Sequence, residues 1–234
     1  MKRAKTRAKF CSSKHTALWG SRMVNRFSPE SPIQTTVFLV RHGVTAANKE
    51  NRFAGRTAEP LHPEGIEQVR QLGEQLRGQG ISRIFAGPLA RTRQTAEIIS
   101  SAIDAPIIFA DALTEISIPH WDGLTKEEIR REFGSQYPTW LERPADFSVP
   151  DCETLAAVQQ RAVRYLERIF EECAGERVLV VSHLVVLRCL ILHYQGRLIN
   201  DYRSIKVANG AIAALERTRE GDRFFEMDAK NSAA

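Results

Sequence analysis

Two histidines of this 234-residue chain each follow an apolar run of four residues. The run VFLV (37–40) leads directly into Arg41 and His42, and the run VLVV (178–181) leads, one residue later, into His183. Each run could simply end where the chain meets water, or it could deliver charged and titratable side chains to a fixed place. The second interpretation has chemical consequences, because a guanidinium can grip the oxygens of an anion and an imidazole can act as a nucleophile.

The elements that would position these side chains alternate between strand and helix from Thr36 onward. The apolar runs predict strands at 37–40, 83–87, 106–110, 178–181 and 210–216, and the helical stripes predict helices at 63–76, 89–103, 153–172 and 184–194. This pattern favours an α/β fold with three layers, α/β/α, around a mostly parallel central sheet. Ligands of such sheets bind beyond the carboxyl ends of the strands. We therefore expect His42, Gly87 and His183 to meet at one edge of the sheet.

Several motifs for other chemistries are absent from the sequence. It contains no G-x-x-x-x-G-K-[ST], no G-x-G-x-x-G, no G-x-S-x-G and no H-E-x-x-H. His183 and His193 are not at the spacing of metal ligands on a helix, and no cluster of Cys or Asp accompanies them. We predict that the protein uses neither a metal nor another cofactor.

Four segments follow one another in a recognisable order: R-H-G-V-T-A-A-N (41–48), P-L-A-R-T-R-Q-T-A (88–96), L-T-E-I (113–116) with W-D-G-L-T (121–125), and V-S-H-L-V-V-L-R (181–188). In order and spacing they resemble the histidine phosphatase superfamily, also called phosphoglycerate mutase-like. The resemblance extends over residues 36–216 and implies a phosphoglycerate mutase-like fold.

The resemblance also implies roles for individual side chains. His42 would attack the phosphoryl group, and His183 would close the pocket and contact the phosphate. Glu115 would serve the leaving group as a general acid. The remaining phosphate-binding residues implied by the resemblance are Arg41, Asn48 and Arg91.

Elementary chemistry explains why such a site needs these residue types. A phosphomonoester carries nearly two negative charges, so a neutral imidazole such as His42 can approach it where an anionic nucleophile would be repelled. Neighbouring arginines should lower the pKa of His42 and keep it neutral. Gly43 is expected to remove a side chain where substrate and backbone approach closely. Burial and the incoming phosphate should raise the pKa of Glu115, while the arginines lower it, so we expect a competent acid mainly in the substrate complex.

Each proposed residue also has a purely structural interpretation. Taken alone, His183 would be a core histidine with satisfied hydrogen bonds, and Arg91 would belong to a solvated helix face. Five other conspicuous side chains are expected to be bystanders or core residues: His62, His120, Trp121, Tyr137 and Trp140.

The sequence departs from the family pattern at three places. Leu184 replaces the usual small residue after the second histidine, and Gly87 replaces a frequent serine before P-L-x-R. The segment 61–65, LHPEG, stands where L-T-x-x-G is usual. None of these changes removes a proposed catalytic side chain, so they bear on substrate specificity rather than on activity.

The segment around 114–150 is expected to form a small helical cap over the site. Cofactor-dependent phosphoglycerate mutases have a longer insertion there, which excludes water. The shorter segment favours hydrolysis of a small phosphorylated metabolite through a phosphohistidine. A cofactor-dependent phosphoglycerate mutase and a non-catalytic relative that binds a phosphorylated ligand remain as alternatives, as does the choice between broad-specificity and alpha-ribazole phosphatase branches.

The net charge of +5 comes from the N-terminal region. Residues 1–35 contain eight Lys or Arg and a single acid, Glu30, and the rest of the chain is close to neutral. We predict a disordered basic extension at 1–35, a histidine phosphatase domain at 36–228 and a short tail at 229–234. The extension is compatible with an organelle transit peptide or with a start at Met23.

The remaining features suggest an ordinary intracellular enzyme. The four cysteines (Cys11, Cys152, Cys173 and Cys189) form no C-x-x-C pair and are expected to be free thiols of a reducing compartment, with Cys189 in the core. We predict a cytoplasmic location, or an organellar one if 1–35 is a transit peptide. Neither nucleic acid nor membrane is expected as a partner, and a homodimer is left open.

Overall fold

The computed structural model describes residues 34–227, so the predicted extension and tail lie outside the described residues. A six-stranded sheet has the order β3-β2-β4-β1-β5-β6. Its strands are β1 (Thr35–Arg41), β2 (Ile81–Ala86), β3 (Ile107–Phe109), β4 (Arg177–Ser182), β5 (Ile212–Thr218) and β6 (Gly221–Met227). The first four pair in parallel, whereas β5 runs antiparallel to β1 and β6 antiparallel to β5. The predicted mostly parallel sheet is confirmed, with an antiparallel hairpin at one edge.

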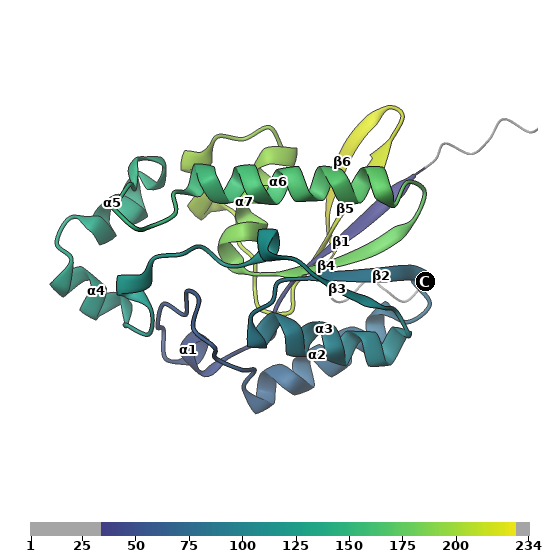
Figure 1. The fold of residues 1–234 in the computed structure, drawn as a ribbon, viewed down its shortest axis with the longest axis horizontal. Coiled ribbons are helices and arrows are strands. Elements are labelled where there is room, and N and C mark those ends of the chain that lie inside the picture. The colour runs from purple at the N-terminus through teal and green to yellow at the C-terminus, as the bar shows by residue number, and fades with distance from the viewer. Residues whose placement is uncertain (1–33, 228–234) are drawn as a thin grey trace, which may run out of the picture. The chain divides into compact units, whose positions relative to one another are not determined.

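Helices cover both faces of this sheet (Figure 1). The longer ones are α2 (Pro63–Leu76), α3 (Ala90–Ile103), α6 (Leu155–Glu172) and α7 (Leu184–Tyr194). Helices α2 and α3 lie on one face, and α6 and α7 lie on the other (Figure 1). The three-layer α/β/α fold predicted from the sequence is therefore confirmed.

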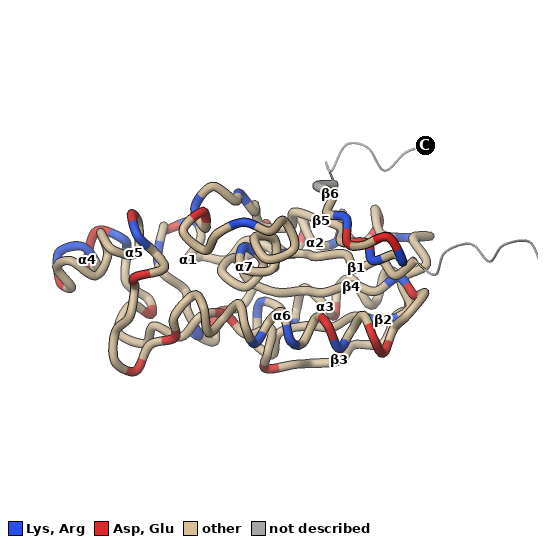
Figure 2. The backbone as a smooth tube through the Cα atoms, turned by 90° about the horizontal axis from the view of Figure 1, so that it is seen from above, with Lys and Arg blue, Asp and Glu red and all other residues tan. Residues whose placement is uncertain are grey.

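The central strands are apolar throughout because both of their faces are buried. Val37 and Leu39 of β1 pack into the cluster that contains α6 and α7, and Phe38 and Val40 pack into the cluster that contains α2 and α3. Figure 2 shows the charged residues mainly on the helices and loops around these strands. The alternation fixes the strand register, and with it the place where β1 ends.

Short elements form the rest of the described chain: α1 (Ala46–Lys49), η1 (Asp111–Leu113), η2 (Pro119–Trp121), α4 (Lys126–Glu132), α5 (Gln136–Glu142), η3 (Pro144–Asp146) and η4 (Ile199–Ser204). Helices α4 and α5 lie beyond the carboxyl ends of the parallel strands (Figure 1). Each is only seven residues long, and a Thr125 capping box starts α4. Within residues 34–227, no helix combines the length and apolar character needed to cross a bilayer.

The sequence analysis did not predict β6, α1 or η4, the last of which lies in a stretch where no element was expected. The strand expected at 210–216 was taken as the last, but β6 follows it at the sheet edge. The sequence GDRFFEM of β6 gives a weak strand signal because an edge strand buries only part of its surface. The single-turn helix α1 was also missed, although Thr45 and Asn48 form a capping box at its start.

Candidate active site

Parallel pairing of β1 and β4 brings the two histidines together. Arg41 lies opposite Ser182 in the strand register, and the His42 amide donates to the Ser182 carbonyl at 3.1 Å. The ring centroids of His42 and His183 are 5.2 Å apart, and both side chains are buried. The two strand ends therefore meet at one sheet edge, as the sequence predicts.

Gly87 completes this edge just after β2. Its amide donates to the Val181 carbonyl at 3.1 Å. A Cβ at this position would lie 2.8 Å from the Leu113 carbonyl oxygen and 3.2 Å from Nε2 of His183. The glycine is thus explained first by the close approach of the Leu113 carbonyl and then by the nearby His183 ring.

The hydrogen bonding of His42 defines its tautomer. Nδ1 lies 2.8 Å from the Gly43 carbonyl oxygen, which can only accept, so Nδ1 carries the proton and Nε2 keeps a free lone pair. Burial lowers the pKa of His42 well below its usual range, and the Arg91 and Arg41 guanidiniums lower it further. His42 is therefore neutral near pH 7. The sequence analysis attributed this to the arginines, but burial is the larger cause.

His183 occupies the N-cap position of α7 and is completely buried. Neither Nδ1 nor Nε2 has a hydrogen-bond partner among the described residues. Burial lowers the pKa of His183 well below its usual range, with Arg91 and His42 adding to the effect. An unpartnered buried polar group costs about 1–3 kcal/mol, so this ring does not fit the description of a satisfied core histidine.

Two arginines flank the histidines, and backbone carbonyls fix their side chains. Nη1 of Arg41 donates to the Val207 carbonyl at 2.8 Å. Arg91 donates through Nη1 to Thr57 at 3.0 Å and through Nη2 to Gly55 at 2.5 Å. Arg91 is only 1% exposed, which contradicts the alternative of a solvated helix face.

These guanidiniums keep donor capacity for a ligand. In both Arg41 and Arg91 the buried Nε has no partner among the described residues. Burial lowers the pKa of Arg41 to about 10, and burial likewise lowers the pKa of Arg91. Both remain charged near pH 7, so the site presents fixed positive charge beside neutral imidazoles.

Asn48 is oriented by the loop that precedes β5. Its Oδ1 accepts from the Thr45 amide at 3.2 Å and from Nδ2 of Asn209 at 2.9 Å. Because both partners are donors, the oxygen is occupied and the amide NH₂ of Asn48 remains available. Asn209 also donates to the His42 carbonyl at 3.0 Å, which ties Asn48 to the end of β1.

Glu115 contributes a buried carboxyl group. It is 8% exposed, and its two oxygens accept from the Ile116 amide at 3.0 Å and the Val185 amide at 3.4 Å. Burial raises the pKa of Glu115, although these amides and the Arg91 and Arg41 charges oppose the shift. The sequence analysis expected an acid mainly in the substrate complex, but burial already raises the pKa without one.

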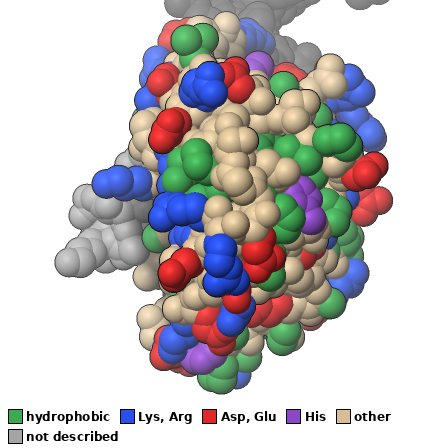
Figure 3. All heavy atoms as spheres, turned by 90° about the vertical axis from the view of Figure 1, so that its left-hand side faces the viewer, with side chains coloured by type: hydrophobic (Ala, Val, Ile, Leu, Met, Phe, Trp, Pro, Cys, Tyr) green, Lys and Arg blue, Asp and Glu red, His purple; other side chains and the backbone are tan. Residues whose placement is uncertain are grey.

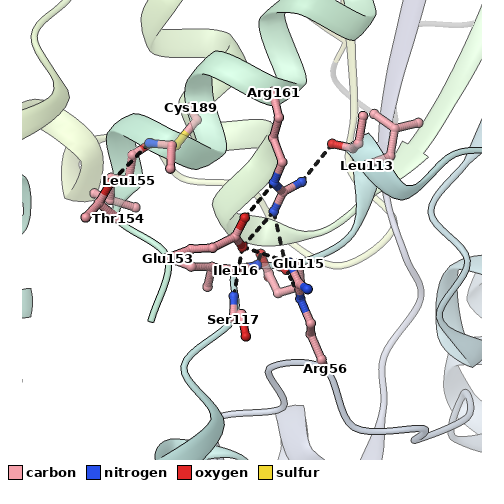
Figure 4. Close-up of polar contacts among 12 residues, drawn as sticks. Arg56, Leu113, Glu115, Ile116, Ser117, Glu153, Thr154, Leu155, Arg161 and Cys189 are labelled. Carbon is pink, nitrogen blue, oxygen red and sulfur yellow. Dashed lines mark hydrogen bonds and ion pairs between the residues drawn. The ribbon is translucent and has the colours of Figure 1, made fainter. Parts of the chain in front are cut away.

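The backbone of Glu115 is held by two more arginines (Figure 4). Its carbonyl accepts from Nε of Arg56 at 3.0 Å and from Nη2 of Arg161 at 3.4 Å. Glu153 joins these two side chains, pairing with Arg56 at 2.8 Å and with Arg161 at 2.9 Å. Burial opposes the ionisation of Glu153, yet Arg161 and Arg56 hold the pKa of this carboxyl below its usual range.

The loop around Arg56 therefore connects Glu115 to Arg91. The carbonyls of Gly55 and Thr57 fix the Arg91 guanidinium, and the side chain of Arg56, between them, fixes the Glu115 backbone. Three consecutive residues thus position both the Arg91 guanidinium and the backbone of Glu115. No motif in the sequence indicates this connection, because it depends on tertiary contacts.

These side chains surround a cavity of about 360 Å³. Of the predicted residues, Arg41, His42, Asn48, Arg91 and Glu115 line it. His183 is not in the lining and lies against His42 instead. The lining also includes residues that the sequence analysis missed: Asn51, Arg52, Lys126, Arg188, Tyr202, Arg203 and Asn209. Two of these residues could have been suspected from the sequence, because Asn209 precedes a turn glycine and Arg188 follows His183 on the same predicted helix.

Three expectations for neighbouring residues need correction or refinement. A Cβ on Gly43 would lie 2.7 Å from the Gly65 carbonyl oxygen, so α2, rather than substrate, is the neighbour that requires this glycine. Tyr137 and Trp140 belong to the core as expected, but they also line the cavity. Leu184 is half-buried in the cavity wall, where it can restrict the space for substrate.

Other expectations agree with the structure. Trp121 is completely buried, and His62 and His120 lie outside the cavity lining. Cys152, Cys173 and Cys189 are free thiols, and Cys189 is completely buried; Cys11 lies outside the described residues. The prediction that no metal is used stays a prediction; within residues 34–227, no three side chains of His, Cys, Asp or Glu gather as a metal-binding cluster.

Comparisons with known proteins show the family of this chain. The family model described as "Histidine phosphatase superfamily (branch 1)" matches residues 37–229. A protein from Citrobacter koseri named "Probable phosphoglycerate mutase GpmB" is 34% identical over 187 residues, which cover 77% of this chain and 84% of that protein.

Solved structures show the same fold. Bacillus stearothermophilus YhfR superposes with a TM-score of 0.78 at 29% identity, over 81% of this chain and 94% of that one. The alpha-ribazole phosphatase from Shigella flexneri superposes with a TM-score of 0.74 at 25% identity, over 82% of this chain and 96% of that one.

Proposed function

Because this chain belongs to the histidine phosphatase superfamily, branch 1, we propose that it hydrolyses a small phosphomonoester through a phosphohistidine on His42. The observation that carries the proposal is the protonation state of His42 together with the charges around it. Its Nδ1 proton is engaged by the Gly43 carbonyl, its ring is neutral, and the charges of the Arg41 and Arg91 guanidiniums lie close to it.

In the first half-reaction, Arg41 and Arg91 grip the phosphoryl oxygens with their remaining N–H groups, assisted by the Asn48 amide. Nε2 of His42 donates its lone pair to phosphorus as the bond to the ester oxygen breaks. Glu115 gives its proton to the departing oxygen, and the alcohol leaves. The positive charge of the two guanidiniums is placed where negative charge spreads in the transition state.

In the second half-reaction, water attacks the phosphorus of the phosphohistidine. The Glu115 carboxylate takes one proton from this water, the bond to Nε2 breaks with its electron pair returning to His42, and inorganic phosphate is released. The neutral His183 ring lies against His42 but outside the cavity lining, so we assign its one N–H to an oxygen of the phosphoryl group held at Nε2 of His42, which would satisfy a nitrogen that otherwise lacks a partner.

The first test uses p-nitrophenyl phosphate in the presence of EDTA. We expect steady release of p-nitrophenolate by the wild-type protein, and a fall of about 10⁴-fold or more for His42→Ala, since the nucleophile is lost. Undiminished turnover by His42→Ala would overturn the proposal. Abolition of turnover by EDTA would show that a metal is required.

Phosphoglycerate mutase activity is the second candidate, favoured by the name of the 34% identical relative. Hydrolysis is preferred because exposed side chains, Lys126 and Arg203, line the cavity and leave a route for water. The test supplies 3-phosphoglycerate with 2,3-bisphosphoglycerate. Isomerisation faster than phosphate release would favour the mutase.

A further inference from the structure

The cavity contains more positive charge than the proposed chemistry uses. Beyond Arg41 and Arg91, its lining includes Lys126, Arg188 and Arg203, which we call the outer cations. They come from three separate elements: the start of α4, the second turn of α7, and η4. Among the residues that line this cavity, Glu115 is the one carboxylate.

No carboxylate neutralises the outer cations. Within residues 34–227, no ion pair involves Lys126, Arg188 or Arg203. Arg52, in the same lining, shows the contrast, because it pairs with Glu50 at 2.8 Å and with Glu128 at 3.6 Å. Within residues 34–227, several other surface arginines also lack an ion pair, but the outer cations differ from them in lining one cavity together.

The outer cations are close enough to repel one another. After burial, the nearby charges of Arg203, Arg188 and Arg41 lower the pKa of Lys126. Arg188 likewise lowers the pKa of Arg41. Like charges held together in a partly desolvated cavity cost free energy, and a bound anion would relieve that cost.

Arg188 is the best-fixed member of the group. Its guanidinium lies 4.8 Å from the ring centroid of Tyr202, which is 2% exposed, and its buried Nε has no partner among the described residues. Along α7, Arg188 follows His183 by five residues, about 7.5 Å of helix rise. Arg188 and His42 also line the same cavity of about 360 Å³, so one small molecule can reach both.

We propose that Lys126, Arg188 and Arg203 form a second anion-binding subsite, and that the substrate is a small phosphomonoester with a second anionic group a few bonds from the ester. This group is a carboxylate or a further phosphate, since guanidinium and ammonium donors recognise both. The inference rests on the proposed function for the phosphomonoester, and adds the class of substrate. Figure 3 shows Lys and Arg side chains exposed on the α4–α5 end of the molecule, where such a substrate would enter.

Binding to the catalytically inactive full-length His42→Ala protein tests the subsite without turnover. Calorimetry compares two matched pairs: 3-phosphoglycerate with glycerol 3-phosphate, and fructose 1,6-bisphosphate with fructose 6-phosphate. In at least one pair we expect the ligand with the second anion to bind about tenfold or more tightly, a difference of about 1.4 kcal/mol. The pair with the larger ratio distinguishes carboxylate from phosphate. Equal affinities within both pairs would overturn the inference.

Substitutions of the outer cations test whether these side chains cause the preference for a ligand with a second anion. In the His42→Ala background, Arg188→Gln should reduce the preference for the second anion about tenfold, and Arg188→Lys should restore part of it. Lys126→Gln and Arg203→Gln change exposed side chains, so they provide the same test if Arg188→Gln fails to fold. Arg131→Gln, on α4 but outside the cavity lining, is the control for net charge. A preference unchanged in all three Gln variants would overturn the inference.

The outcomes separate this inference from the proposed function. If wild-type protein hydrolyses p-nitrophenyl phosphate but His42→Ala binds both members of each pair equally, the subsite is wrong and the phosphatase stands. If p-nitrophenyl phosphate is not hydrolysed but the preference is found and disappears in Arg188→Gln, the subsite stands and the phosphatase is wrong.

Discussion

The cavity has an inner half, lined by Arg41, His42, Asn48, Arg91 and Glu115, and an outer half, which contains the outer cations. The two halves are built in opposite ways. In the inner half, backbone carbonyls fix the nucleophile candidate and an arginine: His42 by the Gly43 carbonyl, Arg91 by those of Gly55 and Thr57. In the outer half, Lys126 and Arg203 are exposed and come from a seven-residue helix and a 3₁₀ helix. A preorganised inner half suits chemistry that is common to all substrates, whereas an adaptable outer half suits the choice among them.

This difference predicts how substitutions divide. A change in the inner half should affect every phosphomonoester, including p-nitrophenyl phosphate. A change in the outer half should affect only substrates that reach it. The predictions below concern the inner half and are ordered from the largest expected effect to the smallest.

Glu115→Gln should give the largest effect, and it should depend on the leaving group. An alkyl alkoxide needs a proton as it leaves, so kcat for an alkyl phosphate should fall by about 10²–10⁴-fold. A p-nitrophenolate leaves without protonation, and its release should fall much less. Measurement of kcat for both substrates checks this. An equal fall for the two would show that Glu115 does not act as the acid.

Arg91→Lys should lower kcat/KM by about 10²-fold for both kinds of substrate, because an ammonium cannot replace two fixed guanidinium donors. The matched control is Arg93→Lys, an exposed position on the same helix, which should change kcat/KM little. If Arg91→Lys retained wild-type kcat/KM, Arg91 would serve only to neutralise charge.

Glu153→Gln tests whether the contacts behind Glu115 matter for catalysis. The substitution weakens the link between Arg56 and Arg161 while keeping an acceptor for the Ser117 amide. As a positioning residue, Glu153 should change kcat for an alkyl phosphate about tenfold and p-nitrophenyl phosphate less. Glu172→Gln, which removes an exposed ion pair with Arg168, is the control. Equal losses on both substrates would indicate a purely structural role.

The inner half was also the more predictable half. His42 and His183 follow apolar strands, and strand order with the α/β pattern was sufficient to bring them to one edge. Asn209, Lys126 and Arg203 were missed because they come from a loop and from short helices, whose positions depend on tertiary packing rather than on periodicity. Arg188 lies on the helix predicted at 184–194, but its place in the cavity wall was not recognised from the sequence. The β6 strand was missed for a related reason, since Phe225 and its neighbours at the sheet edge are largely exposed.

The cause of the neutral histidines could not be predicted either. Residue types near His42 suggested that arginines keep it neutral, but the sequence does not reveal how deeply the ring is buried, and burial is the larger cause. The same burial raises the pKa of Glu115. Depth of burial is a property of the packed layers, so sequence reasoning gave the correct direction for His42 with the wrong leading cause.

Acid sensitivity of folding gives the smallest effect and measures that burial directly. Below pH 6.5 an unfolded chain protonates His42 while the native state, with its lowered pKa, does not, so unfolding becomes easier as pH falls. Between pH 7.5 and 5.5 the wild-type free energy of unfolding should fall about 1.4 kcal/mol more than that of His42→Gln. The raised pKa of Glu115 has the opposite effect, because it makes the native state less stable as pH rises above 4.5. Glu115 is present in both proteins, so this effect cancels when the two free energies of unfolding are compared. Urea denaturation at pH 7.5 and at pH 5.5 measures this difference in the free energy of unfolding. The control is Thr95→Val, a buried substitution without a titrating group, which should keep the wild-type pH dependence. If His42→Gln also kept the wild-type pH dependence, burial would not lower the pKa of His42 in the native state.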